Sequence, residues 1–390
     1  MPLQERSKVS QRIEIVKLAL DDGANITALS ERFSVCRKSI YNWINRYRAQ
    51  GPMGLEERST RPQASPWKTA PEVEELVLEM RDGHPAWGAR KIKHCLDDRG
   101  CSGIPSVNTV NKVLKRNGRI DPDEAGKHMA TKRFVCERPN DHWQVDFKGH
   151  FPTDRGRCHP LTVLDDCSRY SLGLRASPNE RGDTVKDELT EIFRSYGMPG
   201  AIVVDNGPPW AVPASRTSYT DLAVWLIRLG IRLIRIAEYH PQTNGKVERF
   251  HRSLVAEVLQ GRHFRDLDEC QEAFDEWRYI YNLERPHEAC DNKPPVSLYK
   301  SSPRNFPKVL PVIEYGPEDE VRKVQCGGLI HFRGDVHFVG NAFRGLPVAV
   351  RPTGEDGVYD VYCVRQKLLR ISITESGTPL GGYPREEKTS

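Results

Sequence analysis

Hydrophobic residues in the first part of the chain recur at the spacing of amphipathic helices. Three such segments cover residues 11–20, 26–33 and 36–48 and are separated by short turn signals. This order predicts a helix-turn-helix whose last helix enters the major groove of DNA; a plain three-helix bundle is the alternative. The outward residues of that helix, which we predict to contact DNA, are Arg37, Lys38, Tyr41, Asn42, Asn45 and Arg46.

A second set of three helical segments follows at residues 71–82, 88–99 and 106–117. Ser106 can accept a hydrogen bond from the backbone of the last segment, so it predicts where that helix begins. We interpret the set as a second helix-turn-helix. The predicted DNA contacts on its last helix are Asn108, Thr109, Lys112, Lys115 and Arg116.

The hydrophobic pattern changes to that of β-strands after residue 140. Trp143, Val145 and Phe147 alternate with polar residues, which places Asp146 on the opposite face of its strand. Strands and then alternating helices and strands continue to residue 300, which predicts an α/β layer fold. From residue 320 short strands recur between glycine-containing turns, which predicts a small all-β barrel of the SH3-like kind.

The predicted fold class is therefore multidomain, with tandem all-α helix-turn-helix domains, an α/β core and a C-terminal all-β barrel. Proline-rich or polar linkers separate these domains, and the C-terminal tail is expected to be disordered. The domains are expected at 1–50, 71–118, 140–300 and 320–375, the linkers at 51–70, 119–139 and 301–319, and the tail at 376–390.

Charge and composition limit the classes of function. Residues 1–120 carry 21 Lys and Arg against 14 Asp and Glu, whereas the whole chain of 390 residues has a net charge of +5. The predicted helix-turn-helix region therefore suits a polyanionic partner. Apolar runs fall short of the roughly 20 residues of a membrane span, and the N-terminus lacks a secretory pattern. The ten cysteines include no Cys-x-x-Cys pair, which favours reduced thiols over a zinc site.

Three acidic residues lie on three separate predicted elements. Asp146 lies within a strand, Asp205 ends an apolar strand before a turn signal, and Glu248 lies just inside a helix. Phosphodiester cleavage at neutral pH needs a strong nucleophile and compensation of charge, which two divalent ions can supply. Because Mg²⁺ prefers carboxylate oxygens, we predict that Asp146 bridges two Mg²⁺ ions while Asp205 and Glu248 each bind one. Mn²⁺ is the expected substitute metal.

Neighbouring residues add alternatives and further contacts. Glu238 is an alternative third ligand, although it ends a predicted strand, and the pair Asp165 and Asp166 is expected to form structural hydrogen bonds. Residues one helical turn from Glu248 share its face, although Arg252 could instead form a surface ion pair with it. The predicted DNA contacts in this segment are Asn244, Lys246, His251 and Arg252.

These motifs resemble the DDE transposases of bacterial insertion sequences that have a retroviral-integrase-like core, most closely the insertion-sequence 481 group. The resemblance covers about residues 140–300 and implies a ribonuclease H-like fold with Asp146, Asp205 and Glu248 as the catalytic residues. The motifs that carry it are Asp-His-Trp-Gln-Val-Asp (141–146), Leu-Asp-Asp-Cys-Ser-Arg-Tyr (164–170), Val-Asp-Asn-Gly (204–207), residues 240–251, and Tyr281-Asn282 with Arg285-Pro286-His287.

The function implied by this resemblance is transposition. The protein would bind inverted-repeat ends, nick them by metal-assisted hydrolysis and join the freed 3′-OH to target DNA without a covalent protein–DNA intermediate. The implied partners are double-stranded DNA of the ends and the target, and further copies of the chain in a homodimer or larger assembly. The expected location is the bacterial cytoplasm, at the nucleoid, with no membrane partner. Two alternatives are a catalytically idle DNA-binding regulator and a ribonuclease H-like nuclease without strand transfer.

One departure from the family concerns the spacing of the acids. The 42 residues between Asp205 and Glu248 exceed the family's usual number, and the extra residues are expected in the surface loop 208–218, which tolerates additions at little cost. We hypothesise that Trp210 in this loop stacks on or wedges beside a distorted end base. A loop anchored by a buried indole is the alternative.

Overall fold

The structure is a computed structural model that describes residues 8–57, 69–120, 136–211, 219–235 and 245–373. The chain divides into two compact units, residues 1–68 and residues 69–390. The predicted disordered tail and the alternative ligand Glu238 lie outside the described residues, as do Asn244 and most of the loop 208–218.

The first unit contains the three helices that the sequence predicts. They are α1 (Lys8–Leu20), α2 (Ile26–Arg32) and α3 (Arg37–Gln50), followed by the 3-10 helix η1 (Gly51–Leu55). Asn25 begins α2 by accepting hydrogen bonds from the backbone N–H groups of the first turn. A small core joins the helices and contains Ile15, Val16, Ile40, Ile44 and Leu55.

The second unit begins with another set of three helices. They are α4 (Pro71–Gly83), α5 (Ala89–Asp98) and α6 (Val107–Arg116). The Ser106 side chain caps α6, as predicted, by accepting a hydrogen bond from the backbone of Thr109. The fully buried indole of Trp87 anchors this set, together with Ile92 and Val110.

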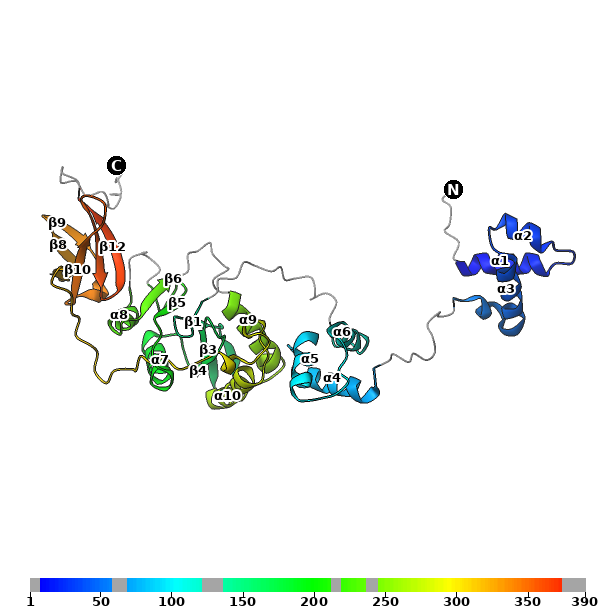
Figure 1. Ribbon diagram of the computed structural model, residues 1–390, viewed down its shortest axis with the longest axis horizontal. Coiled ribbons are helices and arrows are strands. Elements are labelled where there is room, and N and C mark those ends of the chain that lie inside the picture. The colour runs from blue at the N-terminus through cyan, green and yellow to red at the C-terminus, as the bar shows by residue number, and fades with distance from the viewer. Residues whose placement is uncertain (1–7, 58–68, 121–135, 212–218, 236–244, 374–390) are drawn as a thin grey trace. The chain divides into compact units, whose positions relative to one another are not determined.

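A mixed sheet follows (Figure 1). Its strand order is β2-β3-β1-β5-β6, with β4 paired to β3. The pairs β1–β3 and β3–β4 are antiparallel, whereas β1–β5 and β5–β6 are parallel. The parallel neighbours β1 and β5 therefore bring their carboxyl ends to one edge of the sheet. The strands are β1 (His142–Phe147), β2 (Phe151–Thr153), β3 (Gly156–Asp165), β4 (Ser171–Ser177), β5 (Ala201–Val204) and β6 (Arg232–Arg235).

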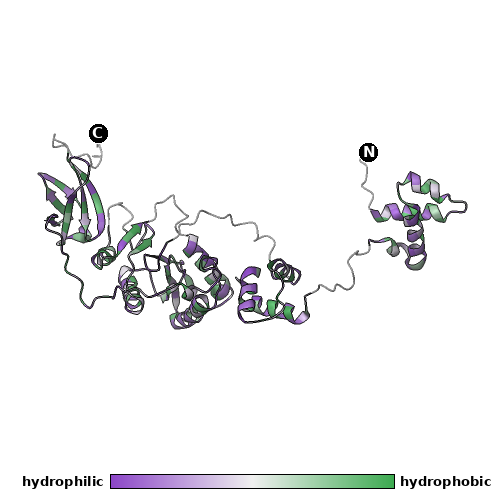
Figure 2. Ribbon diagram, in the orientation of Figure 1, coloured by the Kyte–Doolittle hydropathy of each residue, from purple (hydrophilic) through white to green (hydrophobic). Residues whose placement is uncertain are grey.

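Helices cover both faces of this sheet, and Figure 2 shows that they carry both hydrophobic and hydrophilic residues. Trp143 and Val145 belong to the core shared with α7 (Gly182–Tyr196) and α8 (Asp221–Arg228). The opposite face packs on a helical pair through Leu164 and Leu174. Because alternate residues of a strand face opposite sides, Asp146 shares a face with this second pair. The pair consists of α9 (Gly245–Leu254), which continues into the π-helix η3 (Val255–Leu259), and α10 (Leu267–Leu283).

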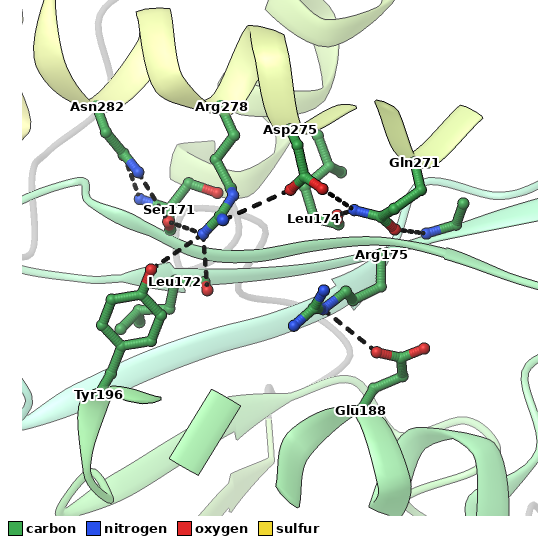
Figure 3. A network of polar contacts seen from close by, with 11 residues as sticks. Ser171, Leu172, Leu174, Arg175, Glu188, Tyr196, Gln271, Asp275, Arg278 and Asn282 are labelled. Carbon is green, nitrogen blue, oxygen red and sulfur yellow. Dashed lines mark hydrogen bonds and ion pairs between the residues drawn. The ribbon is translucent and has the colours of Figure 1, made fainter. Parts of the chain in front are cut away.

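Polar side chains of α10 occupy the outer edge of β4 (Figure 3). Among the described strands, β4 pairs with β3 and with no other. Asn282 accepts a hydrogen bond from the Ser171 N–H at 2.8 Å and donates one to its carbonyl at 2.9 Å, while Gln271 accepts one from the Ala176 N–H at 2.9 Å. These side chains satisfy backbone groups that an edge strand would otherwise leave exposed for pairing with another chain.

We expect Asn282→Ala to lower the free energy of unfolding by about 1–3 kcal/mol, because the buried N–H of Ser171 loses its acceptor. Urea unfolding followed by tryptophan fluorescence would measure the change. The matched control on the same helix is Tyr279→Ala, whose side chain is 61% exposed and should change stability by less than about 0.5 kcal/mol. Equal effects of the two substitutions would contradict the role of Asn282 at this edge.

The C-terminal region is all-β, as predicted, but a closed barrel is not confirmed. Its described strands form a four-stranded sheet of order β12-β11-β10-β7 and a separate pair β8–β9. Phe332, Val348 and Val361 are buried between them. The strands are β7 (Glu320–Lys323), β8 (Leu329–Phe332), β9 (Asp335–Phe338), β10 (Pro347–Pro352), β11 (Val358–Cys363) and β12 (Gln366–Ser372). Within the described parts of the chain, no helix has the length and apolar character to cross a bilayer.

Candidate active site

Asp146 and Asp205 lie at the carboxyl ends of the parallel strands β1 and β5, and Glu248 lies on α9, which packs on the same sheet. Asp146 lies near the end of β1, Asp205 directly follows β5, and Glu248 lies in the first turn of α9. In open α/β sheets, ligands bind beyond the carboxyl ends of such strands. The fold therefore directs two of the three acids to the edge where a substrate is expected.

The electrostatic surroundings of Asp146 are acidic. Burial and the charge of Asp205 are the main causes that raise the pKa of Asp146 to about 7. The charges of Glu248 and Glu180 raise this pKa further, and a hydrogen bond from the backbone of Phe147 partly offsets them. Burial and these charges disfavour the ionised form of Asp146, whereas a nearby cation would favour it.

The turn after β5 shapes the second acid. The Gly207 N–H donates a hydrogen bond to the Asp205 carboxylate at 3.2 Å, and a Cβ on Gly207 would lie 3.3 Å from the other oxygen. Burial raises the pKa of Asp205, this hydrogen bond lowers it, and the charge of Glu180 raises it again. The Asn206-Gly207 turn therefore orients the carboxylate and leaves one of its oxygens close to the loop.

The third acid lies on the exposed side of α9. Val247 and Phe250 are buried against the sheet, whereas Glu248 is exposed between them. Across the residues that the structure describes, no three His, Cys, Asp or Glu side chains lie close enough together to hold a metal ion. Among the described residues, the three acids therefore do not form a closed coordination cage.

The second carboxylate pair has the structural role that the sequence predicts. Asp165 accepts hydrogen bonds from the backbone and hydroxyl of Ser168 at 2.8 and 2.6 Å. Asp166 accepts one from Gln144 at 2.6 Å and forms an ion pair with Lys246. Both acids are buried; Asp165 is the last residue of β3 and Asp166 directly follows it.

The predicted DNA contacts near the acids lie in different surroundings. Arg252 is exposed, whereas His251 is 7% exposed and Lys246 is bound to Asp166. Trp210 is 2% exposed and belongs to the main hydrophobic core, as in the alternative of a loop anchored by a buried indole. Stacking of Trp210 on a base would require this side chain to leave the core.

The predicted contacts on α3 and α6 are mostly exposed. On α3, Arg46 is the partly buried one, and it donates a hydrogen bond to the Glu56 carbonyl at 2.6 Å. On α6, Thr109 is partly buried and Arg116 forms an ion pair with Glu74. The other exposed predicted contacts are Arg37, Lys38, Tyr41, Asn42, Asn45, Asn108, Lys112 and Lys115.

Sequence reasoning missed Glu180, whose charge acts on both Asp146 and Asp205. Glu180 lies in the connection between β4 and α7, and its carboxylate contacts His159 Nδ1 at 2.9 Å. Its place in the polar stretch Ser-Pro-Asn-Glu-Arg (177–181) was visible in the sequence. Its closeness to the acids depends on the pairing of β4 with β3, which a single sequence does not show.

Family models match most parts of the chain. Models described as integrase core domain match residues 137–241 and 229–295. A helix-turn-helix domain matches residues 11–63 and a homeodomain-like domain matches residues 39–114. The model described as IS481 family transposase, C-terminal domain, matches residues 319–379. The predicted resemblance to insertion-sequence transposases with an integrase-like core is confirmed.

Relatives of this transposase-like chain include proteins of bacterial insertion elements. The insertion element IS476 uncharacterized 39.2 kDa protein of Xanthomonas euvesicatoria is 27% identical over 284 residues, which are 71% of this chain and 78% of the relative. The insertion element IS407 uncharacterized 31.7 kDa protein of Burkholderia multivorans is 28% identical over 151 residues. These residues are 39% of this chain and 52% of that relative. The Gag-Pol polyprotein of feline leukemia virus is 33% identical over 30% of this chain and 6% of the polyprotein.

Solved structures similar to this chain include proteins of retroviruses. A chain of the simian T-cell lymphotropic virus intasome in complex with PP2A regulatory subunit B56 gamma has a TM-score of 0.38 and 15% identity, with 73% of this chain and 91% of that chain covered. The HTLV-2 integrase catalytic core domain in complex with magnesium, in its dimeric form, has a TM-score of 0.29 and 16% identity, with 41% and 96% covered.

The pKa of Asp146 predicts how stability changes with pH in the metal-free protein. The pKa of Asp146 is about 7 in the folded state, against an ordinary value of 3.8. At a pH between these two values, Asp146 is protonated in the folded protein and ionised in the unfolded chain. The free energy of unfolding should therefore fall as pH rises through this window. Asp146→Asn should remove the fall and be more stable than wild type by roughly 2–4 kcal/mol at about pH 8.

Urea unfolding in EDTA from about pH 4 to pH 8 measures this difference. The two proteins should be equally stable at about pH 4. In a second series with Mg²⁺ in place of EDTA, the difference in stability between them at about pH 8 should be smaller. Parallel pH profiles of wild type and Asp146→Asn would show that the Asp146 carboxyl group titrates normally.

Proposed function

We propose that this chain is a DNA transposase that binds inverted-repeat ends, nicks them by metal-assisted hydrolysis and joins the 3′-OH ends to target DNA. The observation that supports the proposal is the position of Asp146 and Asp205 at the carboxyl ends of the parallel neighbours β1 and β5, with Glu248 in the first turn of α9. The insertion-element names of the bacterial relatives support it. The helix-turn-helix domains would provide the sequence-specific DNA binding that such a nicking enzyme needs.

The acids fit a pair of Mg²⁺ ions by their chemistry. Their donors are carboxylate oxygens, which Mg²⁺ prefers, and the charges of Asp205 and Glu248 help to raise the pKa of Asp146. Asp146 would be a ligand of both ions, and Asp205 and Glu248 would each be a ligand of one. When bound, the ions supply an activated water and compensate negative charge on the phosphate; Mn²⁺ is the expected substitute.

In the proposed reaction, water attacks the phosphorus at the transposon end and the bond to the 3′ oxygen breaks, which leaves a 3′-OH and a 5′-phosphate. That 3′-OH then attacks a phosphodiester of the target, so one P–O bond forms and one breaks. Asp146, Asp205 and Glu248 would hold the cations that position the phosphate, while α3 and α6 hold the end DNA. Two ends must be joined in concert, which calls for a homodimer or larger assembly acting at the bacterial nucleoid.

A nicking and joining assay tests the proposal. A labelled duplex that ends in the inverted repeat flanking the coding region is incubated with Mg²⁺ and a supercoiled target. Wild type should nick the end and yield joined product, whereas Asp205→Ala should bind the end and do neither. Binding without cutting by both proteins would favour the idle regulator, and nicking without joined product would favour a nuclease.

A further inference from the structure

The helix that carries Glu248 also carries a buried histidine on its inner side. His251 is 7% exposed, and its Nε2 lies 3.0 Å from the hydroxyl oxygen of Thr162 on β3. The same hydroxyl donates a hydrogen bond to the backbone carbonyl of Asp146 on β1 at 2.8 Å. A continuous chain of hydrogen bonds therefore joins α9 to the strand segment that bears the first acid.

The strand register explains why Thr162 occupies this place. Thr162 lies directly opposite Asp146 in the antiparallel pair β1–β3. Opposed residues of such a pair project from the same face of the sheet, and this is the face that α9 covers. Thr162 is 1% exposed, so its hydroxyl is confined between the sheet and His251.

The hydroxyl carries a single proton, which determines the role of the imidazole. Since that proton goes to the Asp146 carbonyl, the hydroxyl oxygen can only accept from His251, so Nε2 carries the imidazole proton. Burial and the charge of Lys148 lower the pKa of His251 to about 3. The imidazole is thus neutral at physiological pH and is a fixed donor of one hydrogen bond.

We propose that His251 and Thr162 are positioning residues that hold the Asp146 backbone and the Glu248 helix at a fixed separation for metal binding. This inference rests on the proposed function and replaces the expectation that His251 contacts DNA. Groups that orient metal ligands typically cost 10–100-fold in metal affinity or activity when removed. A shift of α9 relative to β1 would separate Glu248 from Asp146 without unfolding either element.

Paired substitutions separate positioning from packing. His251→Leu fills the same space but cannot donate, and Thr162→Val keeps the shape of the side chain but lacks the hydroxyl. We expect each to raise the Mg²⁺ concentration for half-maximal nicking roughly 10–100-fold, with end binding unchanged. His251→Gln can donate from its amide and Thr162→Ser retains the hydroxyl, so both should stay within about threefold of wild type.

A second readout does not depend on activity. Mg²⁺ should raise the melting temperature of wild type, and His251→Leu and Thr162→Val should require about 10–100-fold more Mg²⁺ for the same rise. The control is His337→Leu, which changes a partly buried histidine of the C-terminal β region and should leave the Mg²⁺ response unchanged.

The outcomes distinguish this inference from the proposed function. If wild type nicks and His251→Leu or Thr162→Val shows the wild-type Mg²⁺ dependence in both readouts, the positioning role is overturned. It is also overturned if His251→Gln is as defective as His251→Leu. If wild type binds ends and never nicks them with Mg²⁺ or Mn²⁺, the proposed function fails, while the Mg²⁺-dependent melting shift still tests the link between His251 and the acids.

Discussion

Replacing Glu248 by Gln is expected to slow nicking at least about 10³-fold while the protein still binds transposon ends. The substitution keeps the shape of the side chain but removes the negative charge that we assign to one Mg²⁺ ion. Stabilisation of charge by a metal ion contributes several kcal/mol to such reactions, and about 4 kcal/mol corresponds to a 10³-fold change in rate. Because Glu248 is exposed, the fold should not depend on its charge.

Single-turnover nicking of a labelled end measures the rate, and a gel-shift titration at fixed salt measures binding. The matched control is Glu276→Gln, which removes an exposed carboxylate from α10 on the same side of the sheet as α9 and should leave nicking within about twofold. Full activity in Glu248→Gln would transfer the third metal ligand to Glu238. Loss of end binding would show that Glu248 serves the DNA interface instead of the metal site.

Local patterns were sufficient for the elements that carry the acids. The alternation of Trp143 and Val145 with polar residues predicted the face on which Asp146 lies, and the structure has that alternation. The apolar run before Asp205 predicted β5, and the Asn206-Gly207 turn predicted its end. These patterns depend only on neighbouring residues, so they can be recognised without knowledge of the tertiary fold.

Tertiary contacts decided what the sequence could not predict. A spacing of three residues places His251 near Glu248 on the helix. The spacing does not determine whether His251 faces solvent or the sheet. In the structure His251 faces the sheet and contacts Thr162. The indole of Trp210 was equally compatible with a DNA contact and with the core that it occupies. The predicted barrel required β7 through β12 to close on themselves, and pairing between distant strands leaves little trace in a single sequence.

A second large effect is expected at a buried ion pair behind the acids, where Glu257→Ala should lower the free energy of unfolding by about 3–5 kcal/mol. Glu257 lies in η3, which continues α9, and Arg285 follows α10. Arg285 donates hydrogen bonds to both Glu257 oxygens at 2.8 and 3.0 Å, and each side chain is 5% exposed. The indole of Trp277 donates to the same carboxylate at 2.5 Å.

The surroundings of this pair are positively charged, which makes the loss of Glu257 costly. Burial and the charges of Arg285 and Arg249 lower the pKa of Lys91 to about 7, and the charge of Glu257 opposes this shift. Without Glu257, the buried guanidinium of Arg285 would keep its charge beside other cations. Removal of one partner of a buried pair therefore costs more than replacement of both by apolar residues.

The double variant Glu257→Leu with Arg285→Met should consequently be more stable than Glu257→Ala, and urea unfolding followed by tryptophan fluorescence would rank the two. The control is Glu191→Ala, which breaks an ion pair with Arg194 whose side chains are 59% and 61% exposed and should cost less than about 1 kcal/mol. If Glu257→Ala costs no more than this control, the charge of Arg285 is compensated by another group. The double variant could instead be less stable than Glu257→Ala. In that case the attraction between Glu257 and Arg285 itself holds η3 and the preceding Glu248 helix against α10.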